Sequence, residues 1–192
     1  MAPAALRKAG TAPDQLAWIE RYAANPDATV TAAAEATGRW AERVDPGSAG
    51  AAWAAPGFDD SRWDTIAVPG QWERSGIAGL GGYDGIMWFR TGVTLTAAEL
   101  ASARDATLQL GRIDERDTVW INGVQVGASL LATDQRSYRI PAGLLRAGLN
   151  TIAVRVIDEM GGGGFSGPAD ALSLTLSAST RKIGRAVRWE TV

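Results

Sequence analysis

The stretch Val119-Trp120-Ile121-Asn122-Gly123-Val124-Gln125-Val126 decides the fold class. Its Asn-Gly pair supplies the positive φ angles of a two-residue type I′ turn, so the sequence predicts a β-hairpin. In that register Ile121 faces Val124, and the four branched residues share one side, which we expect to be the core side. Trp120 and Gln125 then pair on the opposite side. A sheet with one buried face is therefore expected.

Short alternating runs separated by Gly, Pro and Asn continue on both sides of this hairpin, from residue 58 onward. Such a pattern is typical of antiparallel β proteins. The expected fold class is all-β, an antiparallel β-sandwich or jelly roll. The predicted strands are 64–68, 86–95, 106–110, 118–121, 124–126, 137–140, 151–157, 172–177 and 186–189. Two breaks between strands carry helix-turn chemistry, 96–101 with a capping-box pair and 141–148.

The beginning of the chain has a different composition. It is rich in Ala, with apolar residues at helical spacing, which predicts a helix over 13–24 and a weaker one over 27–40. The following residues, 45–57, have the Pro, Gly, Ser and Ala content of a loop. We therefore expect a short helical and loop extension over 1–45 and a β-sandwich domain over 46–192.

Charge and composition exclude several classes of function. With 19 Lys and Arg against 21 Asp and Glu, the chain gives no electrostatic reason to expect nucleic acid or a membrane as a partner. No apolar run has the length of a membrane span. The absence of His and Cys removes imidazole bases, thiol nucleophiles, disulfides and the usual zinc ligand sets. No cofactor or metal is expected, although a structural calcium stays open, and composition alone does not indicate a cellular location.

Tryptophan is in excess, with 8 residues against 3 Tyr and 3 Phe. An indole ring fills a core or stacks on a flat ligand. Alternation along 86–95 buries Met87 and Phe89, which leaves Trp88 and Arg90 together on the opposite face. Trp120 lies on the corresponding face of the hairpin. Two large aromatic side chains are thus expected on faces that are not core.

Six segments together carry a family resemblance, over roughly residues 53–178. They are 58–63 (FDDSRW), 68–73 (VPGQWE), 83–90 (YDGIMWFR), 110–127 (LGRIDERDTVWINGVQVG), 148–158 (GLNTIAVRVID) and 161–168 (GGGGFSGP). In this order they resemble the inserted carbohydrate-binding, galactose-binding-like jelly roll of bacterial sialate O-acetylesterases. That insert is similar to the sugar-binding domain of family 2 glycoside hydrolases. The resemblance implies a carbohydrate partner, a neighbouring esterase catalytic domain, and a periplasmic or secreted location.

The chain departs from the esterase family in its chemistry. The family's nucleophile lies in a Gly-Gln-Ser-Asn block and its base in an Asp-x-x-His block, and neither block occurs here. Without histidine the chain lacks that hydrolytic machinery. It is therefore expected to be no enzyme but a non-catalytic carbohydrate-binding module, such as one that positions an acetylated sugar for a neighbouring domain.

The candidate ligand-binding residues fall into three groups. Indoles would stack on the apolar face of a pyranose while acids, amides and an arginine meet its hydroxyls. The resemblance to family 2 sugar-binding domains points to polar groups on the hairpin and the loop before it. A strand end that opens into four glycines adds an acid, followed by an aromatic that either covers the sandwich or stacks on a ligand. The candidates are Trp72, Asp84, Trp88, Arg90, Asp114, Asp117, Trp120, Asn122, Asp158 and Phe165.

Two other functions stay open. The aromatic face is equally suited to packing against the helices of residues 13–40 or against a partner domain, which would make the chain a structural docking module. A carboxylate-based glycoside hydrolase is the third alternative, with Asp114 and Asp117 or Asp84 and Asp158 as the acid pair. Spacing in the sequence does not fix the separation of roughly 5–10 Å that such chemistry needs.

Overall fold

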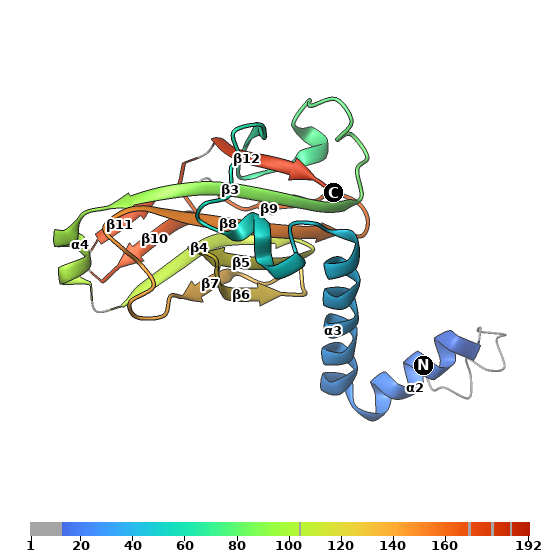
Figure 1. Cartoon of the computed structure of the whole chain (residues 1–192). Coiled ribbons are helices and arrows are strands. Elements are labelled where there is room, and N and C mark those ends of the chain that lie inside the picture. The colour runs from blue at the N-terminus through green and yellow to red at the C-terminus, as the bar shows by residue number, and fades with distance from the viewer. Residues whose placement is uncertain (1–12, 104, 169, 178, 185) are drawn as a thin grey trace. The chain divides into compact units, whose positions relative to one another are not determined.

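The computed structural model describes residues 13–103, 105–168, 170–177, 179–184 and 186–192 (Figure 1). The chain divides into two compact units between Val44 and Asp45. Residues 1–12 of the predicted extension lie outside the described residues.

In its described part, the first unit consists of the helices α2 (Pro13–Ala24) and α3 (Pro26–Val44). Both predicted helices are confirmed, and α3 extends beyond its predicted end. The side-chain oxygen of Asn25 accepts a hydrogen bond from the backbone N–H of Ala28 at 3.1 Å and so caps the start of α3. Pro26 follows at the first helical position, where no donor is needed. None of the described helices is long and apolar enough to cross a membrane.

The second unit is built mainly from strands, with three short helical segments. The strands are β1 (Asp64–Ala67), β2 (Gly70–Gln71), β3 (Gly85–Leu95), β4 (Ala106–Asp114), β5 (Arg116–Ile121), β6 (Val124–Ser129), β7 (Arg136–Arg139), β8 (Gly148–Asp158), β9 (Gly164–Ser166), β10 (Leu172–Leu176), β11 (Ser179–Lys182) and β12 (Ala186–Thr191). The helical segments are η1 (Ala49–Ala54), η2 (Trp72–Arg74) and α4 (Ala97–Ser102).

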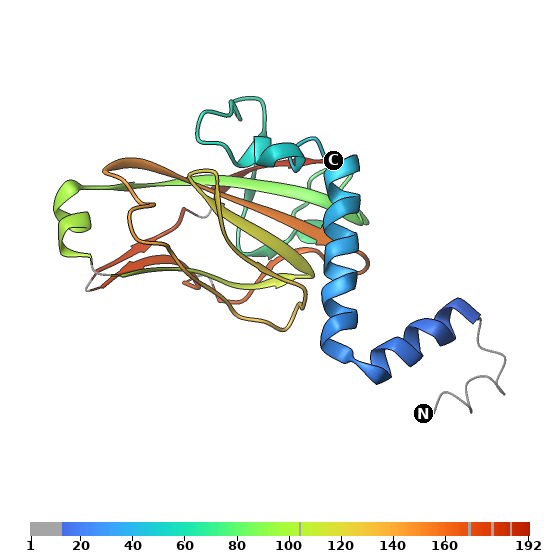
Figure 2. The same cartoon turned by 60° about the horizontal axis from the view of Figure 1, so that its bottom comes forward.

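In the part of the chain that the structure describes, these strands form two antiparallel sheets. The first has the order β1-β12-β3-β8-β5-β6 and the second β11-β10-β4-β9-β2, with β7 also paired to β4. The sheets stack as two layers (Figure 2), which confirms the predicted all-β sandwich. Met87, Phe89 and Val154 of the first sheet and Leu108 and Leu174 of the second belong to the buried core between them.

The long strands β3 and β8 fix the two ends of the sandwich. They pair from Gly85 opposite Asp158 to Leu95 opposite Gly148. Because the strands are antiparallel, the start of β3 and the end of β8 lie at one end of the sheet, while α4 follows β3 at the other (Figure 1). The residues around Asp158 therefore gather at the end opposite α4.

The hairpin forms as predicted in its turn but differs in its register. Asn122 and Gly123 have φ angles of 50° and 82°, as a type I′ turn requires, and Ile121 pairs with Val124. A bulge then shifts the pairing, so Val119 faces Gly127. The predicted core position of Val124 is wrong, since this residue is 49% exposed. It lies on the edge strand β6, where the bulge bends the pairing.

The shortest elements were not predicted. β2 and β9 comprise two and three residues and contain glycine, and β11 is a polar segment exposed throughout, so none shows an alternating apolar pattern. The capping box before α4 is confirmed, with Thr96 and Glu99 bonding reciprocally. The predicted helix turn at 141–148 is absent: a single turn at 142–143 and irregular backbone lead into β8.

Candidate functional site

The outer face of the first sheet is covered by the chain itself. Residues 45–63 run across β3 and β8 on the side away from the core (Figures 1 and 2). Beneath them Trp88 is 0% exposed and Trp120 is 7% exposed. Trp88 and Trp120 lie on the predicted face of the sheet, away from the core. The expectation that they are open to a ligand is wrong, because residues 45–63 lie over them.

We call residues 45–63 the cover. Aromatic rings fill the space between the cover and the sheet. The rings of Trp88 and Trp120 stack with centroids 5.0 Å apart, and Trp53 meets Trp88 edge-on at 5.9 Å. The Trp53 ring also lies 5.2 Å from that of Trp63. The indole N–H of Trp88 donates to the buried carboxylate of Asp45 at 2.8 Å. These contacts assign a packing role to four of the eight tryptophans.

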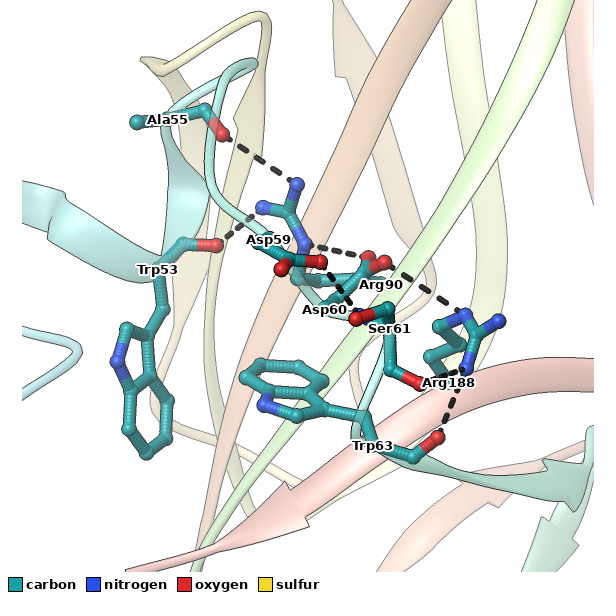
Figure 3. A network of polar contacts seen from close by, with 8 residues as sticks. All are labelled: Trp53, Ala55, Asp59, Asp60, Ser61, Trp63, Arg90 and Arg188. Atoms are coloured by element: carbon teal, nitrogen blue, oxygen red, sulfur yellow. Dashed lines mark hydrogen bonds and ion pairs between the residues drawn. The ribbon is translucent and has the colours of Figure 1, made fainter.

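Arg90 anchors the cover to the sheet (Figure 3). Its Nε donates to Oδ2 of Asp60 at 2.9 Å, and its terminal nitrogens donate to the carbonyls of Trp53 and Ala55. Arg188 lies 3.5 Å from the other oxygen of Asp60. Arg90 was predicted to meet a sugar hydroxyl, but this guanidinium is 4% exposed and already bonded within the chain.

Arg155 fastens the same cover further along β8. It lies on the outer face of the sheet, yet it is only 9% exposed. One terminal nitrogen donates to Oγ of Ser48, and the other donates to Oγ1 of Thr118 at 3.1 Å. Its guanidinium also lies over the Trp120 ring, 5.9 Å from the centroid. The cover is therefore tied to the sheet by Arg90, Arg155 and Arg188 as well as by rings.

Asn122 and Asp117 serve the fold. Asn122 accepts from the backbone N–H of Thr151 at 3.0 Å, and its amide donates to the Asn150 side chain at 2.9 Å. Asp117 is buried, with one oxygen 2.6 Å from Nε of Arg136 and the other accepting from the Tyr138 hydroxyl at 2.7 Å. Burial raises the pKa of Asp117, and these two contacts act against that shift. Both predicted ligand residues therefore have partners within the chain.

The structure brings three of the predicted acids together at the end of the sandwich opposite α4. Asp84 directly precedes β3, and Asp158 ends β8 and pairs with the first residue of β3. Asp114 ends β4 and pairs with Gly164 of β9. Two glutamates that were not predicted, from η2 and from the residue before β5, complete the group. We call the set of Glu73, Asp84, Asp114, Glu115 and Asp158 the acidic end.

Asp158 is the most unusual member of the acidic end. It is 2% exposed, and its Oδ1 accepts a hydrogen bond from the backbone N–H of Met160 at 3.2 Å. Its Oδ2 is buried without a hydrogen-bond partner in the described structure, and so is Oε2 of Glu73. Burial, then the negative charges of Glu73, Asp84 and Glu115, raise the pKa of Asp158 to about 6.

Asp114 has a similar but weaker perturbation. Burial raises its pKa, and the neighbouring charges of Glu115 and Glu73 act in the same direction, while Arg136 opposes them. Two carboxyl groups at the acidic end therefore hold protons more tightly than free aspartate does. In its ionised form each of these carboxyl groups accepts hydrogen bonds, which sugar hydroxyls can donate.

The glycine run packs closely beside these acids. The N–H of Gly163 donates to Oε1 of Glu73 at 3.1 Å, and a Cβ on Gly163 would lie 2.0 Å from the Trp72 ring. Trp72 is fully buried, and its indole N–H donates to the carbonyl of Tyr83 at 2.9 Å. Trp72 thus supports the acidic end from inside and does not stack on a ligand.

Phe165 covers the sandwich core, which was one of its two predicted roles. It lies in β9 and is 3% exposed. Its ring meets that of Phe89 edge-on, with centroids 5.0 Å apart. The glycine run ends in β9, whose residues Gly164 and Phe165 pair with β2 and β4, so Phe165 faces the core and not a ligand.

Sequence reasoning missed the two glutamates and the cover. Glu73 follows Trp72 in a quoted segment and Glu115 follows Asp114, so an acid next to each predicted residue was the available signal. Aromatic residues at 53, 58 and 63 within a loop-like stretch were the signal for the cover. Among the described residues, no group of three or more acidic side chains is arranged to hold a metal ion.

The comparisons with known proteins agree with this architecture. Residues 49–163 match the family described as the beta-galactosidase second all-beta domain. No curated protein matches the chain. A crystal structure of a glycosyl hydrolase family 2 member from Bacteroides cellulosilyticus is similar, with 25% identity and a TM-score of 0.51 over 58% of this chain and 17% of that one.

A second solved structure shows the same fold. It is a beta-glucuronidase from Ruminococcus gnavus, with 19% identity and a TM-score of 0.51 over 61% of this chain and 19% of that one. The chain thus spans less than a fifth of the length of either protein. Because the family match covers more than half of its residues, the chain belongs to the family of the beta-galactosidase second all-beta domain.

Proposed function

We propose that this chain is a non-catalytic carbohydrate-binding module of a longer glycoside hydrolase, and that its acidic end contacts the sugar. The observation that carries the proposal is the buried Asp158 carboxyl, whose Oδ2 has no hydrogen-bond partner in the described structure. Buried polar atoms in folded proteins nearly always have partners, so an unsatisfied one needs an explanation. A hydroxyl of a bound sugar supplies the missing donor.

The other acids fit the same ligand. Asp84 is exposed and Asp114 is half-buried, so both can be reached from solvent. A carboxylate accepts hydrogen bonds from two adjacent hydroxyls, and such charge-assisted bonds are stronger than neutral ones. An open end covers only part of a sugar ring, so the affinity of the isolated module is expected to be weak.

The family match and the similar structures support a glycoside hydrolase of family 2 as the host enzyme. The chain covers under a fifth of those proteins, which supports a module that works beside a separate catalytic domain. The sequence resemblance to the insert of sialate O-acetylesterases makes a carbohydrate esterase the alternative host. In either host the acidic end would hold a sugar for the catalytic domain.

Affinity electrophoresis through gels that contain galactan, xylan or mannan tests the proposal. At least one polysaccharide should retard the chain, and Asp84→Asn and Asp114→Asn should each weaken retardation about tenfold, the usual cost of one charge-assisted hydrogen bond. Asp105→Asn is the matched control, because Asp105 precedes β4 and Asp114 ends it, roughly 30 Å away along an extended strand. Equal retardation of all variants, or none with any polysaccharide, contradicts the proposal.

A further inference from the structure

The acidic end carries an excess of negative charge that the chain does not neutralise. Two arginines beside it are committed to ion pairs elsewhere: Nη1 of Arg116 lies 2.9 Å from Glu159, and Nε of Arg136 lies 2.6 Å from Asp117. The positive charge of Arg136 also lowers the pKa of Asp114, so the negative charge of the five carboxyl groups is offset only in part. The end is therefore a region of negative potential.

The acidic end differs from an ordinary solvated acidic surface because Asp158 is buried. Its carboxyl is held at the strand end, opposite Gly85, with the charges of Glu73, Asp84 and Glu115 around it. Water does not screen a buried group as it does an exposed one, so its interactions with a ligand charge are stronger. The free Oδ2 is the atom that a ligand donor would meet.

We infer that the acidic end selects its sugar by charge, binding an amine-bearing sugar more tightly than a neutral one and rejecting a uronic acid. This inference rests on the proposed function, since it names the class of sugar that the same site takes. A sugar ammonium group brings both a positive charge and three hydrogen-bond donors to the carboxylates. A uronate brings a like charge, which the carboxylates of the acidic end repel.

The physical size of the effect is large enough to measure. The interaction of two unit charges 4 Å apart changes an affinity by about fivefold in water and by more near a protein surface. An amine and a uronate differ by two units of charge at the site. Galactosamine should therefore bind at least about tenfold more tightly than galacturonate at low salt, with galactose between them. Raising the ionic strength should reduce this ratio, because salt screens the charges that remain open to solvent.

The experiment compares galactosamine, galactose and galacturonate with the intact chain at pH 7.5, by amide chemical-shift titration in 20 mM and 500 mM NaCl. The expected order of affinity is galactosamine, galactose, galacturonate, with shifts at Asp84, Glu115 and the glycine run. Asp84→Asn should reduce the ratio of the affinities for galactosamine and galacturonate several-fold. Asp105→Asn, at the other end of β4, should leave that ratio unchanged.

The outcomes separate the inference from the function beneath it. Equal binding of the three sugars at the acidic end, or tighter binding of galacturonate, overturns the charge selection but leaves carbohydrate binding standing. No shift at the acidic end with any of the three sugars overturns both. A galactosamine preference that Asp84→Asn leaves intact also overturns the inference, because the preference then arises elsewhere on the surface.

Discussion

Polar and charged groups are buried both at the outer face and at the acidic end of the sandwich, and the two regions differ in whether these groups have partners within the chain. Under residues 45–63, Arg90 finds a carboxylate and two carbonyls, and Trp88 finds Asp45. At the acidic end, Oδ2 of Asp158 finds nothing in the described structure. A buried polar group with its partners in the chain stabilises the fold, whereas one without a partner needs an explanation, and a bound sugar is the one that we propose for Asp158.

The largest expected effect is at the outer face. Trp88→Ala removes a fully buried ring that contacts two other indoles, and should lower the free energy of unfolding by about 3–5 kcal/mol in urea denaturation. Trp40→Ala is the control, since Trp40 is 41% exposed and should change stability by less than about 0.5 kcal/mol. If Trp88→Ala unfolds at the same urea concentration as the wild type, the ring is not buried.

The anchoring of the cover gives a somewhat smaller effect. Arg90→Met keeps the aliphatic length but removes the donors to Asp60, Trp53 and Ala55, and should cost about 2–4 kcal/mol. Limited proteolysis should then cut within residues 45–63 faster. Arg181→Met provides the comparison, because Arg181 forms an exposed ion pair with Glu99 worth at most about 1 kcal/mol. Unchanged cleavage in Arg90→Met would show that the arginine does not hold the cover.

A single methyl group tests how closely the cover folds on itself. A Cβ on Gly47 would lie 2.6 Å from the Trp53 ring, so Gly47→Ala should destabilise the chain by about 1–3 kcal/mol in urea denaturation. A Cβ on Gly57 meets nothing within 4 Å, and Gly57→Ala should be neutral within about 0.5 kcal/mol. Equal stability of the two variants contradicts the packing of Gly47 against Trp53.

The smallest expected effect on the free energy of unfolding comes from the acidic end. The pKa of Asp158 is about 6 in the folded chain, against an ordinary value of 3.8. The native state therefore holds this proton more tightly, and stability should fall as pH rises from about 4 to 6. Asp158→Asn lacks this loss and should be more stable than the wild type by on the order of 1 kcal/mol at pH 7.5.

Urea denaturation of both chains between pH 4 and 8 isolates this contribution, since the other acids are common to both. The two stability curves should diverge as pH rises through about 6. Parallel curves would mean that the Asp158 carboxyl titrates as an ordinary aspartate. The Asp158 carboxyl would then no longer support a ligand site at the acidic end.

The fold was predictable where its signals are local. The Asn-Gly turn and the alternation of Met87, Trp88, Phe89 and Arg90 predict strands and their faces, because both depend on neighbouring residues only. Whether an outer face meets solvent depends on contacts made far along the chain. Residues 45–57 have loop composition, and Trp53 was the one local sign that they cover β3 and β8. The faces were therefore right and the exposure wrong.

The candidate site was predictable in part for the same reason. Asp158 drew attention as an acid at a strand end, Asp114 through the resemblance to family 2 sugar-binding domains, and Asp84 as a group that could meet a sugar hydroxyl. Their meeting depends on the long pairing of β3 with β8 and on the pairing of β4 with β9. Glu73 and Glu115 gave no separate signal. The indoles were assigned to a ligand because sequence alone does not separate a ring that stacks on a sugar from one that stacks on another ring.

The most direct test of the account is an amide and indole N–H chemical-shift map of the ¹⁵N-labelled chain, titrated with galactose and galactosamine. The account predicts shifts at Asp84, Glu115 and the glycine run after Asp158, while the indole signals of Trp88 and Trp120 stay in place. Shifts of those two indoles with an unmoved acidic end would contradict it, since the sugar would then bind at the face that residues 45–63 cover.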